Sequence, residues 1–273
     1  MAQLPLYSPT DLNHITDCTL KYSFFQQLDA ASHDAVGFDE VLYIDETSSS
    51  NNLLEMAVLK TIQHLHASGG PFRLNLPSAL RALGQYFSEL KVQGKGDYVL
   101  ARQIVANYHR QLKTEWVNVI ASNELMTLTI RLRYQTIQAE AIIDRVDKAA
   151  DGGITGVKFI LSPDRTPDDI GLNTIETTIL HALIAATYPN RRPVRLKYVQ
   201  LDHPQTKNIE LNEKEFRQNW AKMKARVQAW LDGEILARPG PYCDRCPFQY
   251  QGCPLFTAPE IDGDSEEIEP DLS

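Results

Sequence analysis

The sequence predicts a mixed α/β fold, in which helices flank a central sheet and a helical insertion occupies about residues 50–120. Three observations predict it. Helical apolar spacing dominates the first 120 residues, alternating strand patterns begin at residue 126, and a helix separates the third strand from the fourth. The hydrophobic content of 43% is ordinary for a globular protein, so we expect one folded domain over residues 1–258.

The first half of the chain contains four helix signals. Ser8-Pro9-Thr10-Asp11 is typical of a helix start and would place Cys18 inside or just after a short helix. A polar loop is expected at residues 45–52. Further helices are then predicted over residues 53–66, 77–90 and 98–120, the last with Val105, Tyr108, Leu112 and Trp116 along one face.

The second half alternates between strands and helices. Strands are predicted over residues 126–134, 138–147, 154–161 and 194–201, with a turn at Asp151-Gly152-Gly153. Asn173 with Glu176, and Asn212 with Glu215, have the spacing of capping boxes and predict two helix starts. The second of these helices carries an apolar stripe that we expect to be core: Phe216, Trp220, Met223, Val227 and Trp230.

Charge is concentrated at the C-terminus. Residues 260–273 hold seven acids and no base, so removing them from the net charge of −8 leaves residues 1–259 at −1. We expect residues 259–273 to form a disordered acidic tail. No apolar run approaches the length of a membrane helix and no signal peptide pattern precedes residue 14, which favours a cytoplasmic protein without a membrane partner.

All four cysteines fit one metal-binding pattern. Cys243, Cys246 and Cys253 lie in the run PYCDRCPFQYQGCP, and Cys18 is expected to supply the fourth thiolate from the other end of the chain. A C-x2-C pair brings two sulfurs within reach of one metal. Four thiolates suit an iron–sulfur cluster and also zinc, so the sequence leaves both open.

A second candidate site lies on the predicted strands. Asp144 ends an apolar strand, and Lys158 lies on the strand that follows the turn. A carboxylate can hold a divalent ion against a phosphodiester, and a lysine beside it can orient the attacking water and offset the phosphate charge.

The chain resembles the RecB-like iron–sulfur branch of the PD-(D/E)XK nucleases, the type found in AddB and in CRISPR-associated exonucleases. SPTDLNHITDCTLKYSF, IIDRVD and CDRCPFQYQGC carry the resemblance. It implies a restriction-endonuclease-like fold and a structural [4Fe–4S] cluster on Cys18, Cys243, Cys246 and Cys253. It also implies that Asp144 binds Mg²⁺ or Mn²⁺ and that Lys158 assists catalysis.

The sequence departs from this family at several positions. Gly156 stands where the family has a metal-binding acid two residues before the lysine, and Glu176 or Glu140 could supply a replacement carboxylate. Thr177 and His181 stand where the family has Gln and Tyr. The early helix reads NNLLEMAVL in place of the usual histidine motif, because His64 and His66 come too late in it.

Three functions therefore remain open. The first is a metal-dependent exonuclease acting on single-stranded or end DNA, in DNA repair or with a partner in CRISPR adaptation. The second is an inactive pseudo-nuclease that acts as a DNA-binding or scaffold subunit. The third is a zinc-stabilised interaction module unrelated to nucleic acid.

Overall fold

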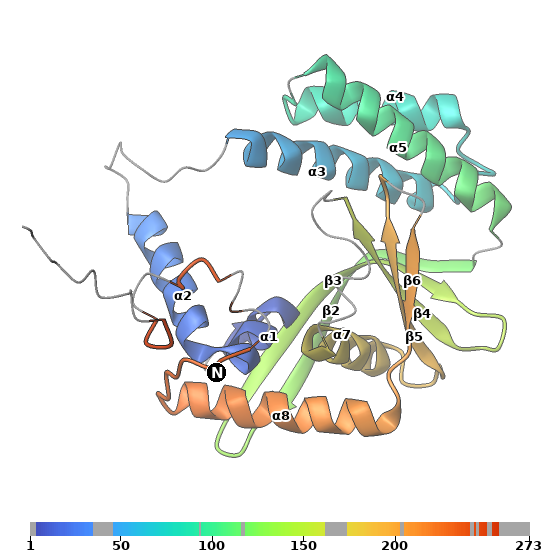
Figure 1. The fold of residues 1–273 in the computed structure, drawn as a ribbon. Coiled ribbons are helices and arrows are strands. Elements are labelled where there is room, and N and C mark those ends of the chain that lie inside the picture. The colour runs from blue at the N-terminus through green and yellow to red at the C-terminus, as the bar shows by residue number, and fades with distance from the viewer. Residues whose placement is uncertain are drawn as a thin grey trace, which may run out of the picture.

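The computed structural model describes residues 4–34, 46–92, 94–115, 118–161, 174–202 and 205–240, residue 243, and segments 246–249 and 253–256. It has a mixed central sheet flanked by helices, so the predicted α/β class is confirmed. Figure 1 shows α3, α4 and α5 on one side of the strands and α1, α2, α7 and α8 on the other.

The sheet is organised around its long third strand. It comprises β1 (Leu6–Tyr7), β2 (Asn118–Arg131), β3 (Thr136–Lys148), β4 (Ile154–Ile160), β5 (Val194–Gln200) and β6 (Thr206–Ile209). Strand β3 pairs in parallel with β1 and antiparallel with both β2 and β4. Strand β5 continues the sheet in parallel with β4, and β6 closes it antiparallel to β5.

The helices build one apolar core on each face of the sheet. Helices α1 (Pro9–Asp17), α7 (Thr174–Thr187) and α8 (Glu213–Leu231) pack on one face. Helices α3 (Glu46–Ala67), α4 (Leu76–Glu89) and α5 (Lys95–Thr114) form the other core with Val157 and Val199 of the sheet. Alternate residues of β4 therefore serve different cores: Ile154 and Ile160 belong to the first, and Val157 to the second.

Strands β3 and β4 separate where the candidate site begins. Their ladder runs from the pair Lys148 and Ile154 to the pair Arg145 and Val157, and β1 pairs with β3 only at Gln138 and Ala139. The stretch of β3 between these two partners, which includes Asp144, has a ladder neighbour only on the β2 side. In a complete ladder the backbone N–H and C=O groups at this edge would pair with a neighbouring strand. Here a side chain can approach them instead.

Several predicted helix ends are confirmed by their hydrogen bonds. Ser8 caps α1 in a capping box with Asp11, and Cys18 is the residue at its C-terminal cap. Asn212 caps α8 by accepting a hydrogen bond from the backbone N–H of Glu215. The expected cap at Asn173, the side chain of Trp116 and the expected tail at residues 259–273 lie outside the described residues.

Two predicted boundaries were wrong. The expected loop at residues 45–52 is helical from Glu46. Its polar residues show no apolar periodicity, so the sequence pattern did not indicate a helix, although such residues can occupy helix turns. The helix expected to reach residue 120 ends at Thr114, and Asn118 already belongs to β2. Val119 and Ile120 are β-branched and fit a strand better than a helix.

The sequence interpretation also missed three elements, which are the short strands β1 and β6 and the helix α2 (Thr19–Asp34). Helix α2 connects the two ends of the chain. The Thr19 hydroxyl donates to the carbonyl of Leu236 and accepts from its N–H, and the N–H of Leu20 also donates to that carbonyl. Among the described residues, no helix is long and apolar enough to cross a membrane.

Candidate active site

Asp144 lies in the gap where β3 and β4 separate. Only 9% of the residue is exposed. Its Oδ2 atom accepts a hydrogen bond from the backbone N–H of Phe159 at 2.8 Å and lies 3.1 Å from Nζ of Lys158. These two donors fix the position of the carboxylate at the edge of the sheet.

Lys158 is held by two acceptors from β3. Its Nζ donates to the carbonyl of Ile142 at 2.9 Å and forms the ion pair with Asp144, while 29% of its side chain stays exposed. An ammonium group has three donors, so one N–H remains for a substrate oxygen or a water. The predicted pair of Asp144 and Lys158 is therefore brought together as expected.

A third charged residue reaches this pair from α3. Burial raises the pKa of Glu55, the negative charge of Asp144 raises it further, and Lys158 acts in the opposite direction. This electrostatic coupling places Glu55 in the neighbourhood of Asp144 and Lys158. The sequence interpretation missed Glu55, although the residue lies in the NNLLEMAVL stretch where the related nucleases carry their early helix motif.

Two carboxylates and a lysine can support phosphodiester hydrolysis with a divalent ion. Mg²⁺ is often held by one or two carboxylates together with water and substrate phosphate, so Asp144 and Glu55 fit such an ion. Bound there, the ion would polarise the scissile phosphate. Lys158, already oriented by Ile142 and Asp144, would offset the negative charge that develops during attack.

Gly156 lies on β4 two residues before Lys158 and faces α7. A Cβ atom added here would overlap Cδ1 of Ile184 and lie 3.2 Å from its Cγ1 atom. Ile184 is fully buried in the core beside the sheet. The space that an acid at position 156 would need is therefore filled by an isoleucine methyl group.

The other residues named from the sequence lie in varied surroundings. Glu176 and Thr177 are buried on α7, and His181 packs against the ring of Phe216 with a pKa lowered by burial and then by Arg192. The suggested role of Glu176 or Glu140 as a replacement carboxylate stays a prediction.

The two histidines of α3, His64 and His66, have different surroundings. His64 is exposed. His66 is largely covered, and its Nε2 atom lies 2.9 Å from the hydroxyl of Tyr108.

The cysteines lie near the junction of the two chain ends. Sγ of Cys18 lies 3.8 Å from the carbonyl oxygen of Leu236, and Sγ of Cys243 lies 3.7 Å from that of Arg238. Two of the four thiols therefore contact one short stretch of chain. Within the described residues, however, no three His, Cys, Asp or Glu side chains are gathered closely enough to hold a metal ion.

The ring of Phe248 strengthens the contact between these ends. It lies between Cys246 and Cys253 in the sequence and packs against Phe24 and Phe25 of α2, with ring centroids 4.9 and 5.1 Å apart. Phe248 thus rests on the helix that follows Cys18, an arrangement that a shared metal centre would require.

Two basic residues of β5 are paired with acidic side chains. Arg195 pairs with Asp151 and Glu210, and Lys197 lies 3.5 Å from Glu115. These acids offset the positive charge of both side chains.

The search of curated proteins found no relative. Two solved structures resemble the chain weakly. The first, SSO0001, has 12% identity and a TM-score of 0.43, and the match covers 94% of this chain and 90% of that chain. The second, a "Putative exonuclease" from Eubacterium rectale, has 13% identity and a TM-score of 0.46, and the match covers 88% of this chain and 86% of that chain.

The family comparison spans nearly the whole described fold. A model of the PD-(D/E)XK nuclease superfamily matches residues 7–253, from β1 to the last cysteine. The match includes Glu55, Asp144 and Lys158 together with all four cysteines. The chain belongs to the PD-(D/E)XK nuclease superfamily.

Proposed function

We propose that this protein is a metal-dependent DNA nuclease of the RecB-like iron–sulfur branch, acting on single-stranded DNA or DNA ends. Asp144 and Glu55 would hold Mg²⁺ or Mn²⁺, and Lys158 would assist the attack of water on the phosphodiester. The observation that carries the proposal is the ion pair of Asp144 with Lys158 where β3 and β4 separate, with Glu55 of α3 coupled electrostatically to both residues.

The electrostatics of the site support a bound cation. The negative charge of Asp144 raises the pKa of Glu55, so the two carboxylates repel each other and Lys158 offsets only part of that repulsion. A divalent cation between them would remove the remaining cost of holding like charges together. The site is therefore more favourable electrostatically with an ion than without one.

Cleavage of labelled single-stranded DNA in the presence of Mn²⁺ tests the proposal. We expect wild-type protein to shorten the strand, and Asp144→Asn, which keeps the shape of the side chain but removes its charge, to abolish shortening. Lys95→Gln, a substitution at an exposed residue of α5, is the matched control and should leave the rate unchanged. Cleavage that persists in Asp144→Asn would show that the activity arises elsewhere.

A second candidate function is favoured by Gly156. Ile184 fills the space of the missing acid, which is the packing expected of a fold that has given up one metal ligand. The protein would then be a pseudo-nuclease subunit that binds DNA without cutting it. Binding of the labelled strand without Mn²⁺-dependent shortening would support this function over the enzyme.

We further propose that Cys18, Cys243, Cys246 and Cys253 hold a structural [4Fe–4S] cluster, with zinc as the alternative metal. The support is the four-thiol donor set and the shared contact of Cys18 and Cys243 with the stretch around Leu236. Such a cluster would join the α1–α2 junction to the C-terminal loop. Anaerobically purified protein should be brown if iron is present and colourless if the metal is zinc.

A further inference from the structure

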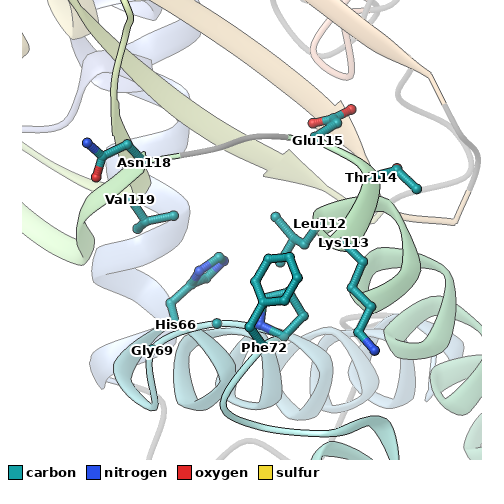
Figure 2. Close-up of a pocket in the computed structure, with 11 residues that line it drawn as sticks. His66, Gly69, Phe72, Leu112, Lys113, Thr114, Glu115, Asn118 and Val119 are labelled. Atoms are coloured by element: carbon teal, nitrogen blue, oxygen red, sulfur yellow. The ribbon is translucent and has the colours of Figure 1, made fainter.

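A separate pocket lies at the far end of α3 from Glu55. It has a volume of about 370 Å³ and is formed by the end of α3 with its following loop, the end of α5 and the start of β2. Figure 2 shows His66, Phe72 and Lys113 around it, with Asn118 and Val119 from β2 opposite. The volume is in the range of small-molecule sites.

The loop after α3 exposes an aromatic ring at this pocket. Gly69 has φ +88°, its N–H donates to the carbonyl of His66, and the N–H of Gly70 donates to that of Leu65. These bonds form a Schellman motif, which ends the helix and turns the chain sharply. Pro71 is then buried, while Phe72 is 77% exposed. A phenyl ring exposed to this extent is free to stack on a planar ligand.

The contact of His66 with Tyr108 favours a neutral ring that can donate from Nδ1. Arg145 donates through Nη1 to the Tyr108 hydroxyl at 2.6 Å, so the hydroxyl hydrogen is available to His66 Nε2 at 2.9 Å. The ring proton then lies on Nδ1. Burial and the charge of Arg145 lower the pKa of His66 to about 4, so the ring is uncharged near neutral pH. An uncharged donor suits the polar edge of a base better than it suits a phosphate.

The two charged side chains of the pocket, Lys113 and Glu115, differ in their ion pairing. Lys113 is exposed and has no described acidic partner. Glu115 is compensated by Lys197 at 3.5 Å. The net attraction for an anion therefore comes from the Lys113 side, next to the exposed ring of Phe72.

The pocket and the candidate active site lie along one helix. Glu55 and His66 are eleven residues apart, which corresponds to about 16 Å along α3 and to nearly the same face of the helix.

We propose that this pocket binds one unstacked nucleobase of a single-stranded DNA, with Phe72 stacking on the base and Lys113 contacting the adjoining phosphate. His66 Nδ1 donates to the edge of the base. The inference rests on the proposed nuclease function, because it names a second contact of the same substrate. Stacking on an exposed aromatic ring with a nearby cation is the usual mode of single-strand recognition.

Binding can be measured without cleavage in the Asp144→Asn background. The probe is a fluorescein-labelled single-stranded oligothymidylate, followed by anisotropy. Phe72→Ala should weaken binding roughly tenfold, and Lys113→Gln should reduce the slope of log affinity against log salt by roughly 0.7. Tyr134→Ala, which removes a ring that is 68% exposed on the β2–β3 turn, is the matched control and should bind normally.

The outcomes separate the pocket from the nuclease proposal. Unchanged affinity in Phe72→Ala overturns the pocket, whether or not the wild-type protein cleaves DNA. Weakened affinity in Phe72→Ala with no Asp144-dependent cleavage supports the pocket and overturns the enzyme. A blunt duplex that depends on Phe72 as strongly as the single strand also contradicts the proposal, because a paired base cannot enter the pocket without being flipped out.

Discussion

Ile184 of α7 fills the space beside Gly156 of β4, so the two residues are matched in size across the helix–sheet interface. We expect Gly156→Asp alone to destabilise the protein by about 1–3 kcal/mol, because the new side chain overlaps Cδ1 of Ile184. Gly156→Asp with Ile184→Ala should recover part of this loss and add a carboxylate near Lys158. Urea denaturation and Mn²⁺-dependent cleavage measure the two effects. Ile184→Ala alone is the reference for the cost of the cavity. A double mutant that is no more stable than Gly156→Asp would contradict the proposed match in size.

Glu55→Gln should separate metal binding from stability. The metal-free protein should become more stable, since the substitution removes a charge that burial and Asp144 both disfavour. Apparent affinity for Mn²⁺ should fall roughly ten- to a hundredfold, as losses at metal sites commonly do. Calorimetric titration and thermal denaturation measure the two changes. Glu89→Gln, at the exposed end of α4, is the control, and identical titrations for Glu55→Gln and wild type would remove Glu55 from the site.

Tyr108 holds together a buried polar chain between α3, α5 and β3. Its hydroxyl accepts from Arg145 and contacts His66, while Arg145 donates through Nε and Nη2 to Oδ2 of Asp147. Tyr108→Phe leaves a buried guanidinium N–H without this acceptor, so we expect a loss of about 1–3 kcal/mol. Chemical denaturation measures it. Tyr98→Phe, on the more exposed turn of the same helix, should cost less than 1 kcal/mol, and equal losses would refute the importance of the chain.

The pH dependence of stability should contain a contribution from His66. Its pKa is about 4 in the folded protein, below the ordinary value of 6.5. The unfolded chain therefore binds a proton first as pH falls, and stability is lost between pH 6.5 and 4, by on the order of 2–3 kcal/mol. His66→Gln should flatten this part of the curve. Parallel curves for wild type and variant over this range would contradict the low pKa of His66.

Loss of the proposed cluster should loosen the contact between the chain ends. Cys243→Ser should lower both the iron content and the melting temperature, because metal binding energy is folding energy at such a site. Thr19→Val is the matched control: it breaks the hydrogen bonds to Leu236 but keeps all four thiols, so it should lower the melting temperature while iron is retained. Unchanged melting temperature and iron content in Cys243→Ser would show that the cluster is absent or not structural.

The sequence predicted the pair of Asp144 and Lys158 because both lie on consecutive strands joined by a turn, where register decides which residues meet. It did not predict Glu55, because that contact joins two distant parts of the chain through helix packing. Glu55 itself lies in NNLLEMAVL, the stretch that corresponds to the early helix motif of the resembling nucleases. The apolar spacing of α3 indicates its core face but not which residues of the sheet that helix would approach.

Short elements escaped prediction for a different reason. Strand β1 has two residues and β6 has four, which is too few to display an alternation of apolar and polar side chains. They exist because the neighbouring strands β3 and β5 offer unpaired backbone groups to them. Tertiary context, rather than local propensity, therefore sets these elements.

The bonds between Thr19 and Leu236 also bear on the order of events during protein synthesis. Residue 19 leaves the ribosome early, but its hydroxyl and the neighbouring N–H of Leu20 meet their partner only after α8 and the residues that follow it have emerged. The nascent N-terminal segment must therefore wait for nearly the whole chain before this junction can form, which makes its completion a late step of co-translational folding.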